Sequence, residues 1–297
     1  MELAQRRAPV SPPRNFGNTQ DAWTAFWQEP GQSRCVAGAP GVWHALESHW
    51  RDFAANLPPS SRVLDLGCGA GAVARMIVAT RVDVQVTGID FARIPLALDP
   101  QFDLLAETAM EQLPFAEACF GAAVSQFGFE YGDTVVAARE LAQVAAPGAR
   151  LSFLVHHVDS GIVATNRVRL GVLEAFLAPR TRAAFCDGDV TGFGSRMAAI
   201  VANHAEDSLA LELARALPSR LQRAPRERQT IWNALEDALA PERCLAHALD
   251  RACVHTSRID AWLQPLRAVC RLEPPAVLRE PDGTPVAWRI QGACANA

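Results

Sequence analysis

The chain has 297 residues, 49% of them hydrophobic and 20% charged, which is the composition of an ordinary soluble globular protein. That length allows one large domain or two small ones, and no apolar run reaches the roughly 20 residues that a membrane span requires. The net charge of −4 argues against a nucleic-acid partner, because such a partner favours a basic face.

The first 20 residues are rich in Pro, Arg, Asn and Gln, and we expect them to form a flexible tail. They lack the apolar segment of a signal peptide, so we expect a cytoplasmic protein. Residues 21–57 place large apolar side chains three to four positions apart, which predicts two helices separated near residues 31–41. The side chains with this spacing are Trp23, Phe26, Trp27, Trp43, Leu46, Trp50 and Phe53.

Short apolar segments then alternate with helical ones. The predicted strands are residues 62–66, 84–89, 102–106, 122–125 and 151–155, and the predicted helices between them include residues 72–80 and 134–144. Strands that alternate with helices in this way predict a parallel, doubly wound sheet. With the N-terminal helices, this α/β core is expected to span residues 21–159.

The pattern changes after residue 160, where apolar residues recur at helical spacing with little strand signal. We expect residues 160–250 to form a helical insertion or lid. Residues 251–297 are expected to add a helix and a β-hairpin around the turn at Asp282 and Gly283, which gives the sheet an antiparallel edge. The predicted fold class is therefore α/β, with a mostly parallel, seven-stranded sheet and a helical insertion before the C-terminal hairpin.

Eight cysteines are scattered through the chain, and no pair has CxxC or zinc-ligand spacing. In a cytosolic chain of this size we expect buried free thiols rather than disulfides or a metal site. Cys68 lies within a glycine-rich segment, but no partner base accompanies it in the sequence. We expect Cys68 to pack or to contribute its backbone, and not to act as a nucleophile.

That glycine-rich segment, VLDLGCGAGAVARMIV at residues 63–78, follows the first predicted strand. Its turn lies at the carboxyl ends of the strands, where open α/β sheets bind ligands. Gly67, Gly69 and Gly71 let the backbone turn tightly and let a ligand approach it closely. A dinucleotide uses such a turn with a GxGxxA pattern, which this segment formally satisfies. A nucleoside cofactor without phosphate uses it together with an acid at the strand end, and Asp65 occupies that place.

The string DLGCGAG at residues 65–71 fits DxGxGxG and resembles the first motif of class I S-adenosylmethionine-dependent methyltransferases. Three further segments resemble that family in the expected order: VTGID, TAMEQLPFAEACFGAAVSQFGFEY and AARELAQVAAPGARLSFLVHH. The resemblance extends over residues 63–155 and is closest to the type 11-like, small-molecule branch. It implies a Rossmann-like methyltransferase fold and S-adenosyl-L-methionine as the cofactor.

The resemblance also implies how the cofactor would be held. Asp65 and the glycines would hold its amino-acid end, and Asp90 would bind the ribose hydroxyls through two acceptor oxygens. The acid that usually receives the adenine amino group is replaced by Ala109, which leaves adenine to the backbone, to Met110 or to Glu111. The expected cofactor-binding residues are Asp65, Gly67, Cys68, Gly69, Gly71, Asp90, Phe91, Met110, Glu111, Ser125 and Gln126.

The side of the site that would face the methyl acceptor carries aromatic residues and histidines. Trp23, Trp27 and Phe127 are expected to line a substrate pocket, although the tryptophans could instead attach the N-terminal helices to the sheet. His156 and His157 end the fifth strand, where a neutral imidazole could take a proton from a hydroxyl or amine nucleophile. Adjacent strand residues point to opposite faces, so we expect at most one of the two to line the site.

These features predict an enzyme that transfers a methyl group to a small apolar or aromatic metabolite by in-line displacement, without a metal. Ala109 and Gly121 stand where the family carries acids, so a catalytically inactive cofactor-binding or regulatory protein of the same fold is an alternative. A third interpretation is an NAD(P)-dependent reductase, which the acid before the glycines fits poorly.

Overall fold

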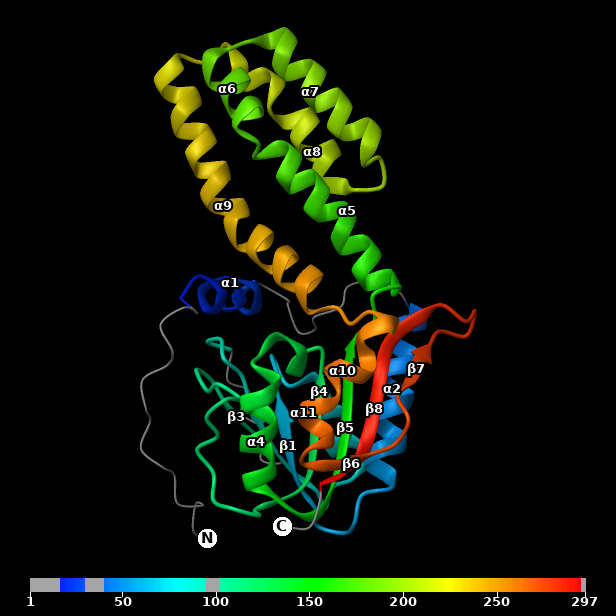
Figure 1. The fold of residues 1–297 in the computed structure, drawn as a ribbon. Helices are drawn as coiled ribbons and strands as arrows, with labels where there is room; N and C mark the ends of the chain where they lie inside the picture. Colours follow the sequence, from blue (N-terminus) through cyan, green and yellow to red (C-terminus); the bar gives the residue numbers. More distant parts are fainter. Residues whose placement is uncertain (1–16, 30–39, 95–101, 295–297) are drawn as a thin grey trace. The chain divides into compact units, whose positions relative to one another are not determined.

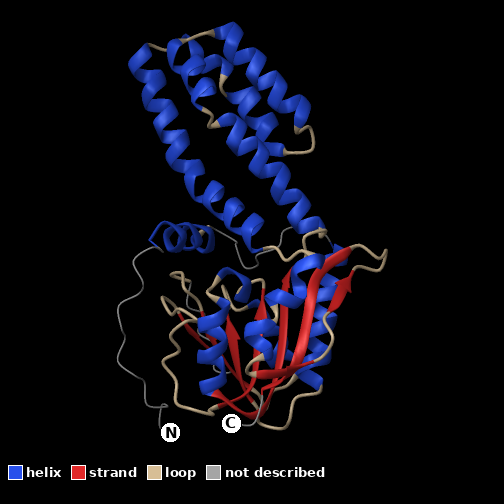
Figure 2. Ribbon diagram, in the orientation of Figure 1, coloured by secondary structure: helices blue, strands red, loops and turns tan. Residues whose placement is uncertain are grey.

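The computed structural model describes residues 17–29, 40–94 and 102–294, and the first 16 residues of the expected tail at residues 1–20 lie outside them. The chain divides into two compact units, one formed by residues up to 163 with residues 252–297, and one formed by residues 164–251. The first is an α/β unit and the second is helical (Figure 1, Figure 2). Within the described ranges, no helix is both long enough and apolar enough to cross a bilayer.

An eight-stranded sheet forms the centre of the α/β unit, in the order β3-β2-β1-β4-β5-β8-β6, with β7 also paired to β8. β8 (Pro285–Cys294) is antiparallel to β5 and begins the expected antiparallel part of the sheet, whose edge is formed by the strands beyond β8. The arrangement confirms the predicted doubly wound, mostly parallel sheet. Its parallel strands are β1 (Arg62–Leu66), β2 (Gln85–Ile89), β3 (Phe102–Leu105), β4 (Phe120–Gln126) and β5 (Ala145–His156).

The strand beyond β8 is interrupted. β6 (Cys270–Leu272) and β7 (Ala276–Arg279) both pair antiparallel with β8, and β5 already occupies the other edge of β8. Pro274 and Pro275 lie between the two pieces, and proline has no N–H to donate to a ladder. The sheet thus has the seven strand positions expected from the sequence, with the last one divided in two.

Helices cover both faces of the sheet. Val63 of β1 packs in one apolar cluster with Trp50, whereas its neighbour Leu64 packs in a second cluster with Leu141. Alternate residues of the strand therefore enter different cores, as expected for a strand that is buried on both faces. The helices are α2 (Pro40–Ala55) and α3 (Ala72–Thr80) on the first face, and α4 (Thr134–Val144), α10 (Ile259–Trp262) and α11 (Gln264–Arg267) on the second.

Helix α1 (Gly17–Gln28) begins inside the stretch that we expected to be tail, and it is attached to the loop after β2. The Gln20 side-chain amide donates to the Phe91 carbonyl at 2.8 Å. The Thr24 hydroxyl accepts from the Arg93 N–H at 3.1 Å. These bonds fix α1 next to the carboxyl end of β2, where ligands of such sheets bind.

The helical unit has its own core. Trp232 is fully buried there, and its ring stacks on Phe176 with 4.9 Å between centroids. That these helices form a lid stays a prediction. The contributing helices are α5 (Gly161–Phe176), α6 (Pro179–Asp187), α7 (Val190–Asn203), α8 (Ser208–Ala216) and α9 (Pro225–Ala252).

Candidate functional site

A tight turn of residues 67–71, which we call the glycine turn, joins β1 to α3. Gly67, Gly69 and Gly71 have φ values of 70°, 51° and 80°, in the left-handed region that other residues enter at a cost. The N–H groups of Gly67 and Cys68 both donate to the Ile89 carbonyl at 2.9 Å. The turn is therefore fastened to the end of β2 at the ligand-binding edge of the sheet.

Gly69 also lies in close contact with an aromatic ring. A Cβ atom at this position would be 2.2 Å from Cζ2 of Trp27. Trp27 comes from α1 and is only 5% exposed. The structure thus places this indole on the glycine turn, and so against the segment expected to hold the cofactor.

Asp90 directly follows β2, and its carboxylate lies beside the glycine turn. Oδ2 accepts from the Gly69 N–H at 2.8 Å, and Oδ1 accepts from the Ala92 N–H at 2.9 Å. Burial raises the pKa of Asp90 to about 6, although the two amide donors act in the opposite direction. Each carboxylate oxygen has a second lone pair, so Asp90 can still accept hydrogen bonds from a vicinal diol.

Asp65 lies in β1, two residues before the turn, and it is fully buried. Neither of its carboxyl oxygens has a hydrogen-bond partner among the described residues. Burial, and secondarily the charge of Asp90, raises the pKa of Asp65 to about 8. An unpaired buried carboxyl is costly, so this position fits a ligand that brings a cationic N–H donor.

Two other expected cofactor-binding side chains are engaged within the protein. The Ser125 hydroxyl donates to the Leu66 carbonyl at 2.7 Å and accepts from the Phe129 N–H at 3.0 Å. The Gln126 side-chain oxygen accepts from the Trp50 indole at 2.7 Å. The structure therefore gives both side chains a role in joining β4 to its neighbours.

Cys68 lies in the turn, whereas Met110 and Glu111 lie against Gly132, and Glu111 Oε1 accepts from the Asp133 N–H at 2.7 Å. The Cys68 sulfur packs against Gly88 of β2, where a Cβ atom would be 2.7 Å from it. Gly132 lies beyond the carboxyl end of β4, and a Cβ atom there would be 2.9 Å from the Met110 sulfur. Burial raises the pKa of Cys68 well above its usual range, which agrees with a packing role for this thiol.

A second group of side chains lies where β4 and β5 end. We call it the β4–β5 cluster, and it consists of Trp23, Phe127, Glu130, Tyr131 and His156. The Phe127 ring stacks on the His156 imidazole with 4.3 Å between centroids. The Tyr131 hydroxyl is 3.1 Å from Nε2 of His156, and its ring meets Trp23 edge-on at 5.2 Å. This cluster brings together two of the predicted substrate residues and one of the predicted catalytic histidines.

Burial acts in opposite directions on the two titratable groups of this cluster. It lowers the pKa of His156 to about 3 and raises the pKa of Glu130 to about 8. Glu130 Oε1 accepts from the His156 backbone N–H at 2.8 Å, while Glu130 Oε2 and His156 Nδ1 have no partner among the described residues. At neutral pH the imidazole is uncharged, and Glu130 titrates close to the working pH.

His157 does not join this cluster. Its ring packs on Trp288 with 4.6 Å between centroids, and Trp288 belongs to the core on the α4 face of the sheet. Its Nδ1 accepts from the Asp159 N–H at 3.1 Å. His156 ends β5 and His157 follows it, and the two side chains lie on different faces of the sheet, so only His156 is positioned beside Tyr131.

Glu130 and Tyr131 were not among the site residues predicted from the sequence, and they belong to the short 3-10 helix η1 (Phe129–Tyr131) after β4. A signal was present, because Tyr131 is the one tyrosine in the sequence and follows an acid a few residues after a predicted strand. Its hydroxyl is the polar group that meets the imidazole.

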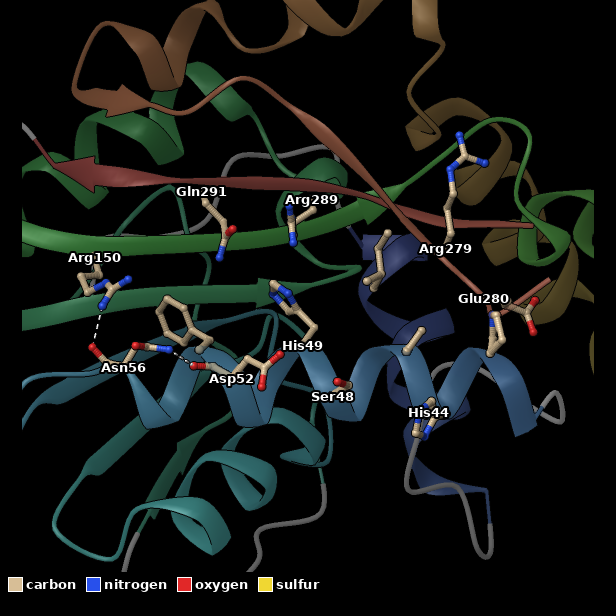
Figure 3. A pocket seen from close by; sticks show the side chains of 14 residues that line it. His44, Ser48, His49, Asp52, Asn56, Arg150, Arg279, Glu280, Arg289 and Gln291 are labelled. Carbon is tan, nitrogen blue, oxygen red and sulfur yellow. Dashed lines mark hydrogen bonds between the residues drawn. The ribbon is translucent and has the colours of Figure 1, made fainter. Parts of the chain in front are cut away.

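A separate pocket of about 430 Å³ lies between α2 and strands β5, β7 and β8 (Figure 3). At this pocket His49 Nε2 is 2.9 Å from the Ser152 hydroxyl. Burial, and secondarily the charge of Arg289, lowers the pKa of His49 to about 4. None of the residues predicted to bind cofactor or substrate lines this pocket, so it is distinct from the expected site.

Residues 64–153 match a family model described as a methyltransferase domain. An O-methyltransferase of Pyrenophora dematioidea is 33% identical over 113 residues, which cover 35% of this chain and 42% of that protein. A demethylmenaquinone methyltransferase of Thermus thermophilus is 34% identical over 119 residues, which cover 35% of this chain and 53% of that protein. The match therefore spans about half the length of these curated relatives.

A solved structure extends the comparison to nearly the whole chain. Burkholderia thailandensis 1,6-didemethyltoxoflavin-N1-methyltransferase, with bound 1,6-didemethyltoxoflavin and S-adenosylhomocysteine, aligns with a TM-score of 0.51. The alignment covers 98% of this chain and 93% of that chain, at 9% sequence identity. At this identity the likeness shows a shared fold.

Proposed function

We propose that this chain, whose residues 64–153 form a class I methyltransferase domain, is an S-adenosylmethionine-dependent methyltransferase that acts on a small apolar or aromatic metabolite. The observation that carries the proposal is Asp65, a fully buried carboxyl without a described partner, located just before the glycine turn. The ammonium of S-adenosylmethionine is the cationic donor that this carboxyl lacks.

Other predicted residues fit the rest of the cofactor. Asp90, held by two backbone amides, is oriented to accept the ribose hydroxyls. Met110 and Glu111 supply an apolar contact and an acceptor for adenine, where Ala109 offers neither. Because Trp27 lies on Gly69, the bound cofactor either contacts this indole or displaces it.

S-adenosylmethionine supplies a methyl carbon that is activated by its sulfonium. The chain's part in the reaction is to align the acceptor and exclude water, and alignment can contribute on the order of 7–11 kcal/mol. Trp23 and Tyr131, both partly exposed, offer aromatic surfaces that a flat apolar acceptor would pack against, while the buried Phe127 ring stacks on His156. These rings support an aromatic or apolar metabolite as the acceptor class.

A hydroxyl or amine acceptor must also lose a proton. His156 and His157 were the expected candidates for the base, but a pKa of about 3 makes His156 a weak one, whereas Glu130 has a pKa of about 8. We therefore assign proton removal to Glu130, and orientation of the acceptor to Tyr131 and His156. His157 has no part in this step, because it packs on Trp288.

Calorimetric titration with S-adenosylhomocysteine tests the cofactor site. The wild-type chain should bind it, and Asp65→Ala and Asp90→Ala should each lose most of that affinity. Asp282→Ala, at the exposed hairpin turn, is the matched control and should bind like wild type. Absence of binding to the wild-type chain, or undiminished binding to both site variants, would contradict the proposal.

Transfer of a labelled methyl group from S-adenosylmethionine to small phenols, amines and quinols then tests the activity. Product formation with one class would identify the acceptor chemistry. Binding without transfer to any of them would instead favour the catalytically inactive alternative. The cytoplasmic location and the lack of a nucleic-acid partner stay predictions from the sequence.

A further inference from the structure

Two thiols face each other at the far end of the sheet from the β4–β5 cluster. Cys294 ends β8 and lies opposite Cys270, the first residue of β6. Their sulfur atoms are 3.1 Å apart, and both residues are about 95% buried, at 5% and 4% exposure. Figure 1 shows β6 and β8 side by side at this edge of the α/β unit.

The register of β6 against β8 makes these cysteines a cross-strand pair whose Cα separation suits a disulfide. The Glu273 N–H donates to the Gln291 carbonyl at 2.8 Å, so these two residues form a hydrogen-bonded pair. Hydrogen-bonded and non-hydrogen-bonded pairs alternate along antiparallel strands, so Cys270 and Cys294, three residues further along, form a non-hydrogen-bonded pair. Such pairs have Cα atoms roughly 4.5 Å apart, which is within the roughly 4.4–6.8 Å range of disulfides.

Gly292 permits a close approach of the two strands near the Cys270–Cys294 pair. A Cβ atom at Gly292 would lie 2.3 Å from the Arg271 carbonyl oxygen, so the missing side chain permits the close approach of β6. Bringing the sulfurs from 3.1 Å to a bond of about 2 Å needs a shift of about 1 Å, which side-chain rotation can supply.

We propose that Cys270 and Cys294 are an oxidisable pair that forms an intrachain disulfide when the protein meets a low-molecular-weight disulfide such as oxidised glutathione. One thiolate attacks a glutathione sulfur and releases the first reduced glutathione. The second cysteine then attacks the mixed disulfide and releases the second. Two protein thiols thus give up two electrons and two protons, and one oxidised glutathione becomes two reduced glutathiones.

The hydrogen bond between the thiols decides which sulfur attacks first. The contact with Cys270 lowers the pKa of Cys294, whereas the same contact and burial raise the pKa of Cys270, so Cys294 is the more thiolate-like of the two. Both sulfurs are buried, but β6 is a three-residue edge strand, and short edge elements open at low free-energy cost. Local opening of β6 therefore gives the oxidant access to Cys294.

The disulfide would close a loop from residue 270 to 294 that contains the interrupted strand and the hairpin. Closing that loop lowers the conformational entropy of the unfolded chain, so the oxidised protein should have a higher free energy of unfolding. On the β5 ladder Ala293 pairs with Arg150, while Ala287 pairs with His156. The bridge therefore lies at the opposite end of β8 from the residues proposed for catalysis.

The test is incubation of the full chain with oxidised glutathione, followed by alkylation of free thiols and peptide mapping by mass spectrometry. We expect a peptide pair linked through Cys270 and Cys294, loss of alkylation at both, and reversal by dithiothreitol. The oxidised protein should unfold several degrees higher than the reduced protein. Cys294→Ala should lose the link and the stability difference, and Cys253→Ser, another buried thiol, should keep both.

A second sample, refolded from urea in a mixture of oxidised and reduced glutathione, removes burial as a kinetic barrier. Free alkylation of both cysteines in this sample would overturn the proposal. A link between either cysteine and a third one, or stable glutathione adducts in place of the link, would overturn it equally. None of these readouts depends on methyl transfer, so the result is independent of the proposed function.

Discussion

The Gly69 amide donates a hydrogen bond to Asp90 Oδ2 across the glycine turn, with 2.8 Å between nitrogen and oxygen. This bond joins the backbone proposed to face the methionine end of the cofactor to the acid proposed to bind its ribose. On the other side of Gly69 lies the Trp27 ring. Gly69 is therefore the position at which a single added methyl group tests the geometry of the site.

We predict that Gly69→Ala destabilises the chain more than Gly148→Ala does. Both glycines have positive φ, at 51° and 78°, so each substitution carries a backbone cost of about 1–2 kcal/mol. At Gly148 nothing lies within 4 Å of an added Cβ, whereas at Gly69 the Trp27 ring would be 2.2 Å away. Urea unfolding monitored by fluorescence measures the difference in the free energy of unfolding.

The clash can be separated from the backbone cost by a second substitution. Trp27→Leu in the Gly69→Ala background should recover part of the lost stability, because a smaller side chain leaves room for the added Cβ. Equal destabilisation by Gly69→Ala and Gly148→Ala would mean that Trp27 does not rest on the turn.

We predict that Asp65 releases its proton when the cofactor binds, because its pKa is raised in the free protein. Its pKa of about 8 leaves the free carboxyl largely protonated at pH 7, and a bound ammonium would favour the ionised form. Calorimetric titration with S-adenosylhomocysteine at pH 7, in buffers of different ionisation enthalpy, should show release of nearly one proton. Affinity should rise between pH 6 and 7.5, by up to about tenfold per pH unit.

Asp65→Asn keeps the size of the side chain and removes its proton. This variant should bind more weakly and should release no proton, with an affinity that no longer rises over that pH interval. Proton release that persists in Asp65→Asn would move the effect to another group, the first candidate being Asp90, whose pKa is also raised.

Local sequence signals were sufficient for several elements of the fold. The predicted segments 62–66, 72–80 and 134–144 coincide with β1, α3 and α4, because each is bounded by glycine, proline or a capping residue such as Asp133. Helix α9 begins inside the predicted helical insertion at residues 160–250 and extends over residues 225–252, passing through Pro241. A proline in a helix interior normally ends it, and only the three-dimensional structure shows that this helix continues.

The site was predictable where its signal lies within one short motif. Asp65 lies two residues before the glycine turn and Gly69 lies within it, so their arrangement follows from a strand-turn-helix segment. The contact between Tyr131 and His156 joins residues 25 positions apart, and it depends on the register of β4 against β5. No pattern in the sequence reveals that pairing before the sheet is assembled.

The buried carboxyls predict that stability falls as pH rises from 6.5 to 8. Asp65 and Glu130 have folded-state pKa values of about 8, above those of the unfolded chain, so the folded state retains protons that the unfolded state has lost. Their contribution to stability is present at low pH and is lost as pH rises through 8. Each contributes a slope of up to about 1.4 kcal/mol per pH unit.

Two buried histidines set the lower pH limit of the interval over which stability falls. Burial lowers the pKa values of His49 and His156, which makes stability rise with pH below about 6.5, in the opposite sense. Urea unfolding at several pH values between 6.5 and 8 measures the slope in wild type. Asp65→Asn and Glu130→Gln should each flatten it, and a slope that neither variant changes would assign it to other groups.

The β4–β5 cluster predicts that kcat and KM respond to different residues. If Glu130 takes the proton from the acceptor, Glu130→Gln should lower kcat by about 100-fold or more, because general-base catalysis contributes that much. It should also remove the limb of the kcat profile near pH 8 that its raised pKa creates. Tyr131→Phe keeps the ring against Trp23 but loses the hydroxyl that meets His156, so it should mainly raise KM for the acceptor.

Affinity for S-adenosylhomocysteine is the control for both variants, and it should stay close to the wild-type value because neither residue lies at the glycine turn. His157→Ala is the matched control on the other face of the sheet, since its ring packs on Trp288 and not on Tyr131. A kcat loss in His156→Ala as large as that in Glu130→Gln, with the pH limb near 8 intact in Glu130→Gln, would return the role of base to His156. An imidazole with a pKa of about 3 would then have to gain basicity from the bound acceptor, and the limb in wild type would belong to Asp65.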